Sequence, residues 1–99
     1  MQIELEKKEK ELILYLTGRL DTTTAPELQK ALDKELGDTS ELKIDMKKLE
    51  YLSSAGLRVL LATTKKMTKK GGKMTICHAN QNVRDVFEIT GFKKLLNIR

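Results

Sequence analysis

The sequence predicts one α/β domain over residues 1–99, built on a mixed sheet of four or five strands with helices mainly on one face. Three observations carry this prediction. Two apolar, strand-like runs at the start suit a β-hairpin, strand-like and helix-like segments alternate afterwards, and each helix-like segment is followed by glycine. Alternating strands and helices require parallel crossovers, so the expected order is ββαβαβα with a possible final β.

The N-terminal hairpin comes first. Residues 3–5 and 12–17 read as strands on either side of the charged turn 7–10. The second strand is apolar at nearly every position, which predicts either burial of both strand faces or one face turned towards a partner. Residues 17–21 end this strand.

A helix is expected next. Thr24–Glu27 has the spacing of a capping box, and Pro26 falls in the first turn, where its missing N–H does no harm. Gly37 is the natural end of this helix. Its apolar face consists of Leu28, Leu32 and Leu36.

The middle of the chain gives a strand and a second helix. Apolar residues alternate over 41–46, which predicts a strand, and 47–52 is expected to be a loop. A helix begins after residues 53–56, and Gly71–Gly72 closes it. Its expected apolar stripe is Leu57, Leu60, Leu61, Thr64 and Thr68; its outer face is Arg58, Ala62, Lys65 and Lys69.

The last part repeats this pattern. Residues 73–77 read as a strand, Asn80 or Asn82 caps a third helix, and Gly91 stops that helix. The core side of the helix is Val83, Val86, Phe87 and Thr90, and the segment with Leu95, Leu96 and Ile98 forms a last short strand or turn.

Bulk properties narrow the function. No run approaches the roughly 20 apolar residues of a membrane span, and the N-terminus lacks an apolar signal core, so a cytoplasmic protein is expected. The single Cys77 fits a reducing compartment. The net charge of +5 raises the alternative of a basic nucleic-acid-binding domain, but the cations are spread along the chain and a solvated surface is favoured.

Enzyme chemistry finds little support in the sequence. His78 is the only histidine and is expected in a loop, and Cys77 is expected to be buried and inert in a strand. Gly71–Gly72 follows a helix and lacks the residues of a phosphate-binding loop. Asp33 and Glu35 point apart on a helix, and no metal-ligand cluster is apparent. We therefore expect neither an enzyme nor a bound cofactor or metal.

The segment Ser53–Leu57 lies where a helix begins. Serine is a common N-cap, which needs no further function. Two serines and a glycine nevertheless leave this end small and open to another protein's active site. Gly56 weakens the helix relative to alanine, which we interpret as a sign of close approach by something external.

Several motifs together resemble one family. Ser53-Ser54-Ala55-Gly56-Leu57 resembles the phospho-acceptor motif of STAS-domain anti-sigma factor antagonists, and Gly18-Arg19-Leu20-Asp21 resembles their Gly-x-Leu-Asp. Gly71–Met74 with Cys77, and Val86–Phe92, also match family patterns in the right order. The resemblance covers essentially the whole chain and implies a STAS-like fold in a protein-binding module.

The resemblance also implies site residues. In that family the acceptor motif usually reads Asp-Ser-Ser/Thr-Gly-Leu, and the serine after the Asp is phosphorylated. Matching its glycine to Gly56 places the acceptor at Ser54, with Ser53 in place of the Asp and as the weaker candidate. Asp21 is expected near Ser54 as an orienting acidic group. The implied partner-binding face consists of Asp21, Thr22, Thr23, Ser53, Ser54, Gly56 and Arg58.

The implied partner is an anti-sigma factor with serine kinase activity, which this chain sequesters while Ser54 is unphosphorylated. A serine phosphatase reverses the modification. No nucleic acid and no membrane span are expected, and the chain is expected to be a monomer or weak dimer. The alternatives are a phosphorylation-independent STAS scaffold or transporter-associated subunit, and the nucleic-acid-binding domain considered above.

Overall fold

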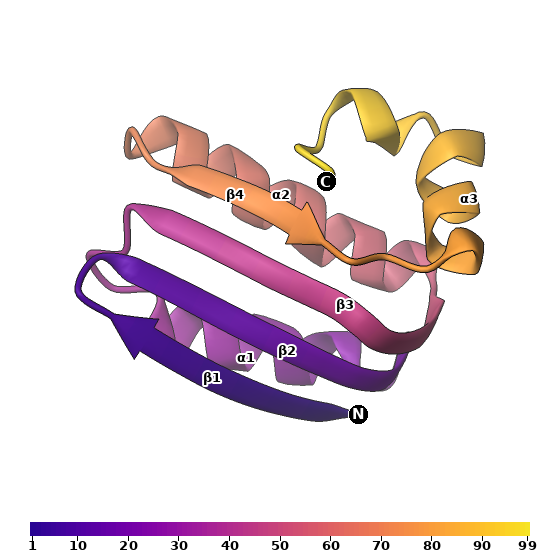
Figure 1. Ribbon diagram of the computed structural model, residues 1–99, viewed down its shortest axis with the longest axis horizontal. Helices are drawn as coiled ribbons and strands as arrows, with labels where there is room; N and C mark the ends of the chain where they lie inside the picture. The colour runs from indigo at the N-terminus through magenta and orange to yellow at the C-terminus, as the bar shows by residue number, and fades with distance from the viewer.

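The computed structural model describes all residues 1–99 and confirms the predicted order of strands and helices (Figure 1). A mixed four-stranded sheet is combined with three α-helices and one short 3-10 helix. The elements are β1 (Gln2–Lys8), β2 (Glu11–Leu20), α1 (Ala25–Glu35), β3 (Glu41–Leu52), α2 (Ser54–Lys69), β4 (Lys73–Cys77), α3 (Gln81–Ile89) and η1 (Phe92–Lys94).

The strand order in the sheet follows the order along the chain, β1-β2-β3-β4. β1 and β2 form the antiparallel hairpin, whereas β2–β3 and β3–β4 pair in parallel through the helical crossovers. Figure 1 shows α1 and α2 lying behind the sheet and α3 at its end, beside the end of β3. The carboxyl ends of β2 and β3 therefore meet at one edge of the sheet.

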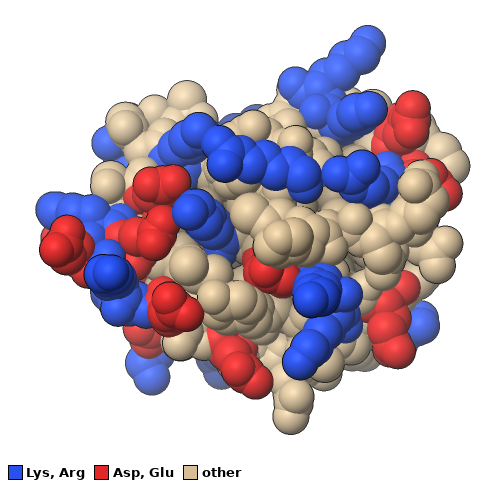
Figure 2. Space-filling model, in the orientation of Figure 1, with Lys and Arg blue, Asp and Glu red and all other residues tan.

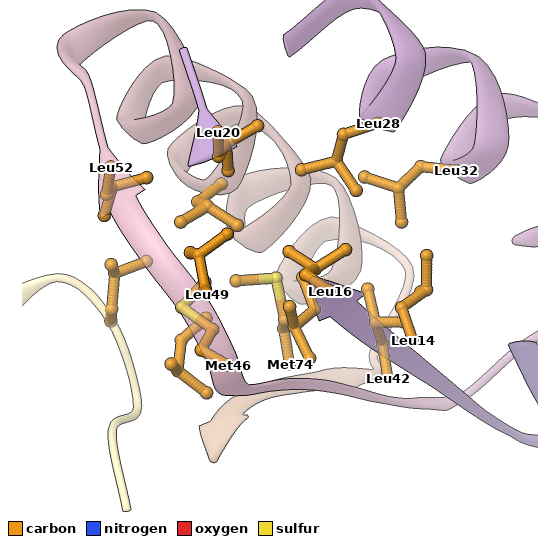
Figure 3. Close-up of a cluster of buried hydrophobic side chains, with 14 of the residues drawn as sticks. Leu14, Leu16, Leu20, Leu28, Leu32, Leu42, Met46, Leu49, Leu52 and Met74 are labelled. Atoms are coloured by element: carbon orange, nitrogen blue, oxygen red, sulfur yellow. The ribbon is translucent and has the colours of Figure 1, made fainter. Parts of the chain in front are cut away.

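The core lies mainly between the sheet and the two helices behind it, and it is largely aliphatic (Figure 3). α3 adds Val83 and the aromatic Phe87 to it. Period-2 side chains from β2 and β3 meet the apolar stripes of the helices, as the alternation in the sequence requires. Its fully or nearly fully buried members include Leu12, Leu14, Leu16, Leu28, Leu32, Leu42, Ile44, Met46, Leu57 and Leu60.

The other face of the sheet is open. Ile13 and Tyr15 are half-buried there, so the expectation that both faces of β2 are buried is wrong. Charged and polar groups pair across the strands: the Tyr15 hydroxyl donates to Glu6 over 3.1 Å, and Lys43 lies 3.1 Å from Glu11. Figure 2 shows acidic and basic side chains interspersed over this face.

β3 is longer than predicted. It runs through residues 47–52, which were expected to form a loop, and β2 likewise extends to Leu20. Two register shifts against β2 each insert an extra residue into β3. The buried positions Met46, Leu49 and Leu52 are consequently three residues apart, and the period-2 signal of a strand is lost.

The buried stripe of α2 also differs from the prediction. Leu57 and Leu60 are buried as expected, but the stripe continues through Thr63 and Met67, while Thr68 is exposed. Thr63 is tolerated there because its hydroxyl donates to the Val59 carbonyl over 2.7 Å. The predicted outer face, Arg58, Ala62, Lys65 and Lys69, is exposed. None of the helices has the length and apolar character needed to cross a membrane.

The predictions for the helix ends and the final strand are only partly confirmed. The capping box predicted at Thr24 does not form, because the Thr24 hydroxyl donates to the Arg19 carbonyl over 2.8 Å. Asn80 caps α3, accepting from the Val83 N–H over 2.9 Å. The possible final strand is a single parallel bridge between Ile76 and Ile98.

Candidate functional site

The candidate site lies where β2 and β3 end side by side. Leu20 and Leu52 are the last register pair of the two strands, and the Ser53 N–H donates to the Leu20 carbonyl over 2.9 Å. The loop that follows β2 begins with Asp21, and the helix that follows β3 begins with Ser54. Ligands of α/β sheets commonly bind at the carboxyl ends of neighbouring strands. The topology thus brings together two motifs that are more than thirty residues apart.

The two serines have different roles. Ser53 is the extended N-cap of α2, half-buried, and its hydroxyl accepts from the Gly56 N–H at 3.5 Å. Ser54 is the first helical residue; it is exposed, and its hydroxyl takes part in no hydrogen bond within the chain. A hydroxyl that is free and exposed can be reached by another protein's active site. Ser54 is therefore the more accessible of the two serines.

Gly56 has an internal role. It is buried, and a Cβ at this position would lie 2.6 Å from Leu20 Cγ and 2.8 Å from Leu52 Cδ1. The start of α2 thus packs directly on the two leucines that end β2 and β3. The interpretation that Gly56 marks the approach of something external is wrong; the approaching atoms belong to this chain.

The loop after β2 is organised by Asp21. Its Oδ1 accepts from the Thr23 N–H (3.0 Å), the Thr23 hydroxyl (2.7 Å) and the Thr24 N–H (3.1 Å). The hydrogen bond from the Thr23 hydroxyl is the main cause that lowers the pKa of Asp21, and the backbone N–H groups add to it. Asp21 therefore holds its own loop in place. No hydrogen bond joins it to Ser54, so the expected orienting contact is absent in this structure.

Two exposed residues beside this loop were not anticipated. The Arg19 guanidinium lies 4.2 Å from the centroid of the Tyr51 ring, and its Nε is 3.8 Å from Asp21 Oδ2. The second register shift places Tyr51, rather than Glu50, opposite Arg19. Tyr51 is 42% exposed although it is a large aromatic residue. Only the three-residue spacing of Leu49 and Leu52 in the sequence could have indicated this arrangement.

The remaining site residues line the same edge. Thr22 and Thr23 are exposed in the loop after β2. Arg58 is exposed one turn into α2 and forms no ion pair, hydrogen bond or aromatic contact within the chain. α2 contains no acidic residue. The edge thus combines one fixed carboxylate, one engaged arginine, one free arginine and the free hydroxyls of Thr22 and Ser54.

Cys77 and His78 lie away from this edge. Cys77 is half-buried and pairs in register with Asp45 on the open face, so its expected place in the core is wrong. His78 is in a loop, as expected, and its Nδ1 is 2.7 Å from Asp45 Oδ2. Asp45 lies well before the end of β3. This pair belongs to the sheet surface rather than to the candidate site.

Two related proteins of similar length are both named as anti-sigma factor antagonists. The anti-sigma F factor antagonist of Paenibacillus polymyxa is 30% identical over 99% of this chain and 86% of its own length. A Bordetella bronchiseptica protein, BtrV, assigned as an anti-sigma factor antagonist, is 33% identical over 99% of this chain and 85% of its own length.

Solved structures agree on the fold. The anti-sigma factor antagonist SpoIIAA in its unphosphorylated form superposes with a TM-score of 0.84 at 17% identity, covering 99% of this chain and 88% of SpoIIAA. The phosphorylated form of a Bacillus SpoIIAA gives 0.77 at 16% identity, with 99% and 91% covered. The family model of the STAS domain matches residues 2–99. The chain therefore belongs to the STAS domain family.

Proposed function

We propose that this chain is an anti-sigma factor antagonist whose binding is switched by phosphorylation of Ser54. In the unphosphorylated state, the edge formed by the Asp21 loop and the start of α2 binds an anti-sigma factor that is also a serine kinase. Phosphorylation ends the binding, and a serine phosphatase restores it. All of these proteins meet in the cytoplasm.

The free hydroxyl of Ser54 carries this proposal. Most other hydroxyls of the edge are engaged: Ser53 caps α2, while Thr23 and Thr24 hydrogen-bond to Asp21 or the backbone beside it. Thr22 is also exposed and free of hydrogen bonds, but it lies in the turn after β2 and not in a helix. Ser54 is exposed and leads a helix, so a kinase can reach it without unfolding the domain. The anti-sigma factor antagonists among the relatives, and a phosphorylated SpoIIAA among the solved structures, support the same assignment.

The modification itself is a simple transfer. The Ser54 oxygen forms a bond to the γ-phosphorus of ATP, the bond between the β- and γ-phosphates breaks, and ADP leaves. The hydroxyl proton passes to a base of the kinase. ATP and magnesium belong to the kinase and not to this chain.

The domain tolerates the new charge, whereas an interface does not. A phosphate carries about −1.5 to −2 charges at neutral pH. At the start of a helix it faces unpaired N–H groups and the positive end of the helix dipole, worth about 0.3–1 kcal/mol in its favour. A docked protein must instead desolvate this charge or place its own carboxylates against it, which costs several kcal/mol. The phosphate is therefore expected to act on binding rather than on folding.

The test is phosphoryl transfer followed by intact-mass measurement. The chain is incubated with ATP and with each candidate anti-sigma kinase encoded beside its gene. A mass gain of one phosphate is expected for the parent and for Ser53→Ala, but none for Ser54→Ala. Phosphate on Ser54→Ala, or no transfer from any candidate, contradicts the proposal. The second result favours a phosphorylation-independent scaffold instead.

A further inference from the structure

The same helix that presents Ser54 carries an unused cation one turn away. We infer that the Arg58 guanidinium binds the phosphate on Ser54, so that the phosphorylated state contains an ion pair within α2. This inference rests on the proposed function, because it concerns the state in which Ser54 is modified. It assigns Arg58 a regulatory role in addition to partner contact.

The helix geometry places the two side chains together. Ser54 and Arg58 are four residues apart in α2, and residues at this spacing lie on one face with their Cβ atoms about 5–6 Å apart. Both residues are exposed. An anion that precedes a cation by four residues is the favourable orientation of such a pair. Arginine also presents several N–H groups in a planar fork that suits phosphate oxygens.

Arg58 has no competing partner. It forms no ion pair, and residues 54–69 contain no Asp or Glu that could hold its guanidinium. Arg19, the other arginine of this edge, is already stacked on Tyr51 and lies beside the Asp21 carboxylate. To reach the phosphate, Arg19 must give up both contacts. Arg58 gives up nothing except water, so it is the cation best placed to respond.

Serine at position 53 supports the same pairing. Here Ser53 is neutral and caps α2. No carboxylate at the neighbouring position 53 competes with the phosphate for Arg58.

The pairing gives the switch a second effect. In the unmodified protein, Arg58 is free to meet a carboxylate of the partner. In the modified protein, the phosphate binds Arg58. A single modification therefore adds an anion to the edge that binds the partner and also makes the Arg58 cation unavailable to the partner. The partner that fits this edge therefore carries an acidic group opposite Arg58.

The inference is tested by the pKa of the phosphate itself. Phosphoserine is installed at position 54 of the full chain during synthesis, and its second ionisation, ordinarily near pH ~6, is followed by phosphorus NMR at low salt. Replacing Arg58 by Gln is expected to raise this pKa by about 0.3 units, the size that an exposed pair at this spacing supports. Lys65→Gln is the matched control. It removes the same charge from the same helix face, but Lys65 lies about 16 Å from Ser54 along the helix axis.

The outcomes separate clearly. A rise in Arg58→Gln with no comparable change in Lys65→Gln supports the inference. Equal values in the two variants overturn it, and so does a rise that appears in Arg19→Gln instead. Because the phosphoserine is installed without a kinase, failure here leaves the mass test of the proposed function unaffected, and failure of that test does not alter this titration.

Discussion

Replacing Gly56 by alanine tests whether the start of α2 packs as tightly as the structure indicates. The added Cβ would lie 2.6 Å from Leu20 Cγ and 2.8 Å from Leu52 Cδ1, both far inside van der Waals contact. Overpacking of a buried site costs about 1–3 kcal/mol. Alanine regains up to about 1 kcal/mol of helix propensity. The net loss in the free energy of unfolding is therefore expected to be about 1 kcal/mol, a fall in Tm of roughly 4–8 °C.

Urea unfolding and thermal melting measure this loss, and two further variants identify its cause. Ala62→Gly, on the exposed face of α2, calibrates the propensity term in the same helix. In a Leu20→Ala background, Gly56→Ala is expected to cost less, because the closest clash is gone. If Gly56→Ala is neutral or stabilising in the parent, the internal packing role assigned to this glycine is wrong.

Further predictions concern charge and binding. Because the hydrogen bond from the Thr23 hydroxyl lowers the pKa of Asp21, this carboxylate stabilises the fold above its ordinary pKa of 3.8, and the contribution disappears as the pH falls through the lowered pKa. Asp21→Asn should thus be less stable than the parent at neutral pH, and urea titrations should show the gap closing as the pH falls below 3.8; a gap independent of pH contradicts this. Ser54→Asp is expected to keep the parent's circular dichroism but lose partner binding, whereas Ser54→Ala binds constitutively; an unfolded Ser54→Asp refutes the interface argument. Lys65→Glu should slow association with the partner in low salt but not in high salt, and a salt-independent association rate opposes electrostatic steering. Tyr51→Ala removes the cation–π contact and should weaken partner binding while changing stability by less than about 1 kcal/mol; unchanged affinity places Tyr51 outside the interface.

Much of the fold could be predicted because the local signals agree with one another. Leu42, Ile44 and Met46 alternate as a half-buried strand must, and Gly37 and Gly91 end helices with positive φ. The end of β3 could not be predicted. Each bulge shifts the buried face by one residue, so Leu49 and Leu52 look like part of an irregular loop.

The buried face of α2 was only partly predictable. Hydropathy favours Leu61 over Thr63, yet Thr63 is buried because its hydroxyl bonds to the backbone within the helix. Met67 is buried where its methyl carbon closely approaches the position of Gly72. Both facts depend on tertiary packing, which a helical pattern alone does not contain.

The grouping of the candidate residues at one edge was predictable, but their contacts were not. The motifs pointed to Asp21, Ser54 and Arg58, and the parallel pairing of β2 and β3 brings their segments to one edge. The sequence could not reveal that Asp21 holds its own loop or that Arg19 stacks on Tyr51. The stack depends on register, which the bulges set, and the role of Asp21 depends on the loop conformation.

The central claim is that Ser54 can accept a dianion that the domain tolerates and the docked partner does not. Calorimetric titration of the kinase identified by the mass assay, with unmodified chain and with chain carrying phosphoserine at position 54, tests this claim most directly. We expect unchanged circular dichroism and an affinity lower by at least about 100-fold in the modified chain. Equal affinities for the two forms, or loss of the fold on modification, would contradict it.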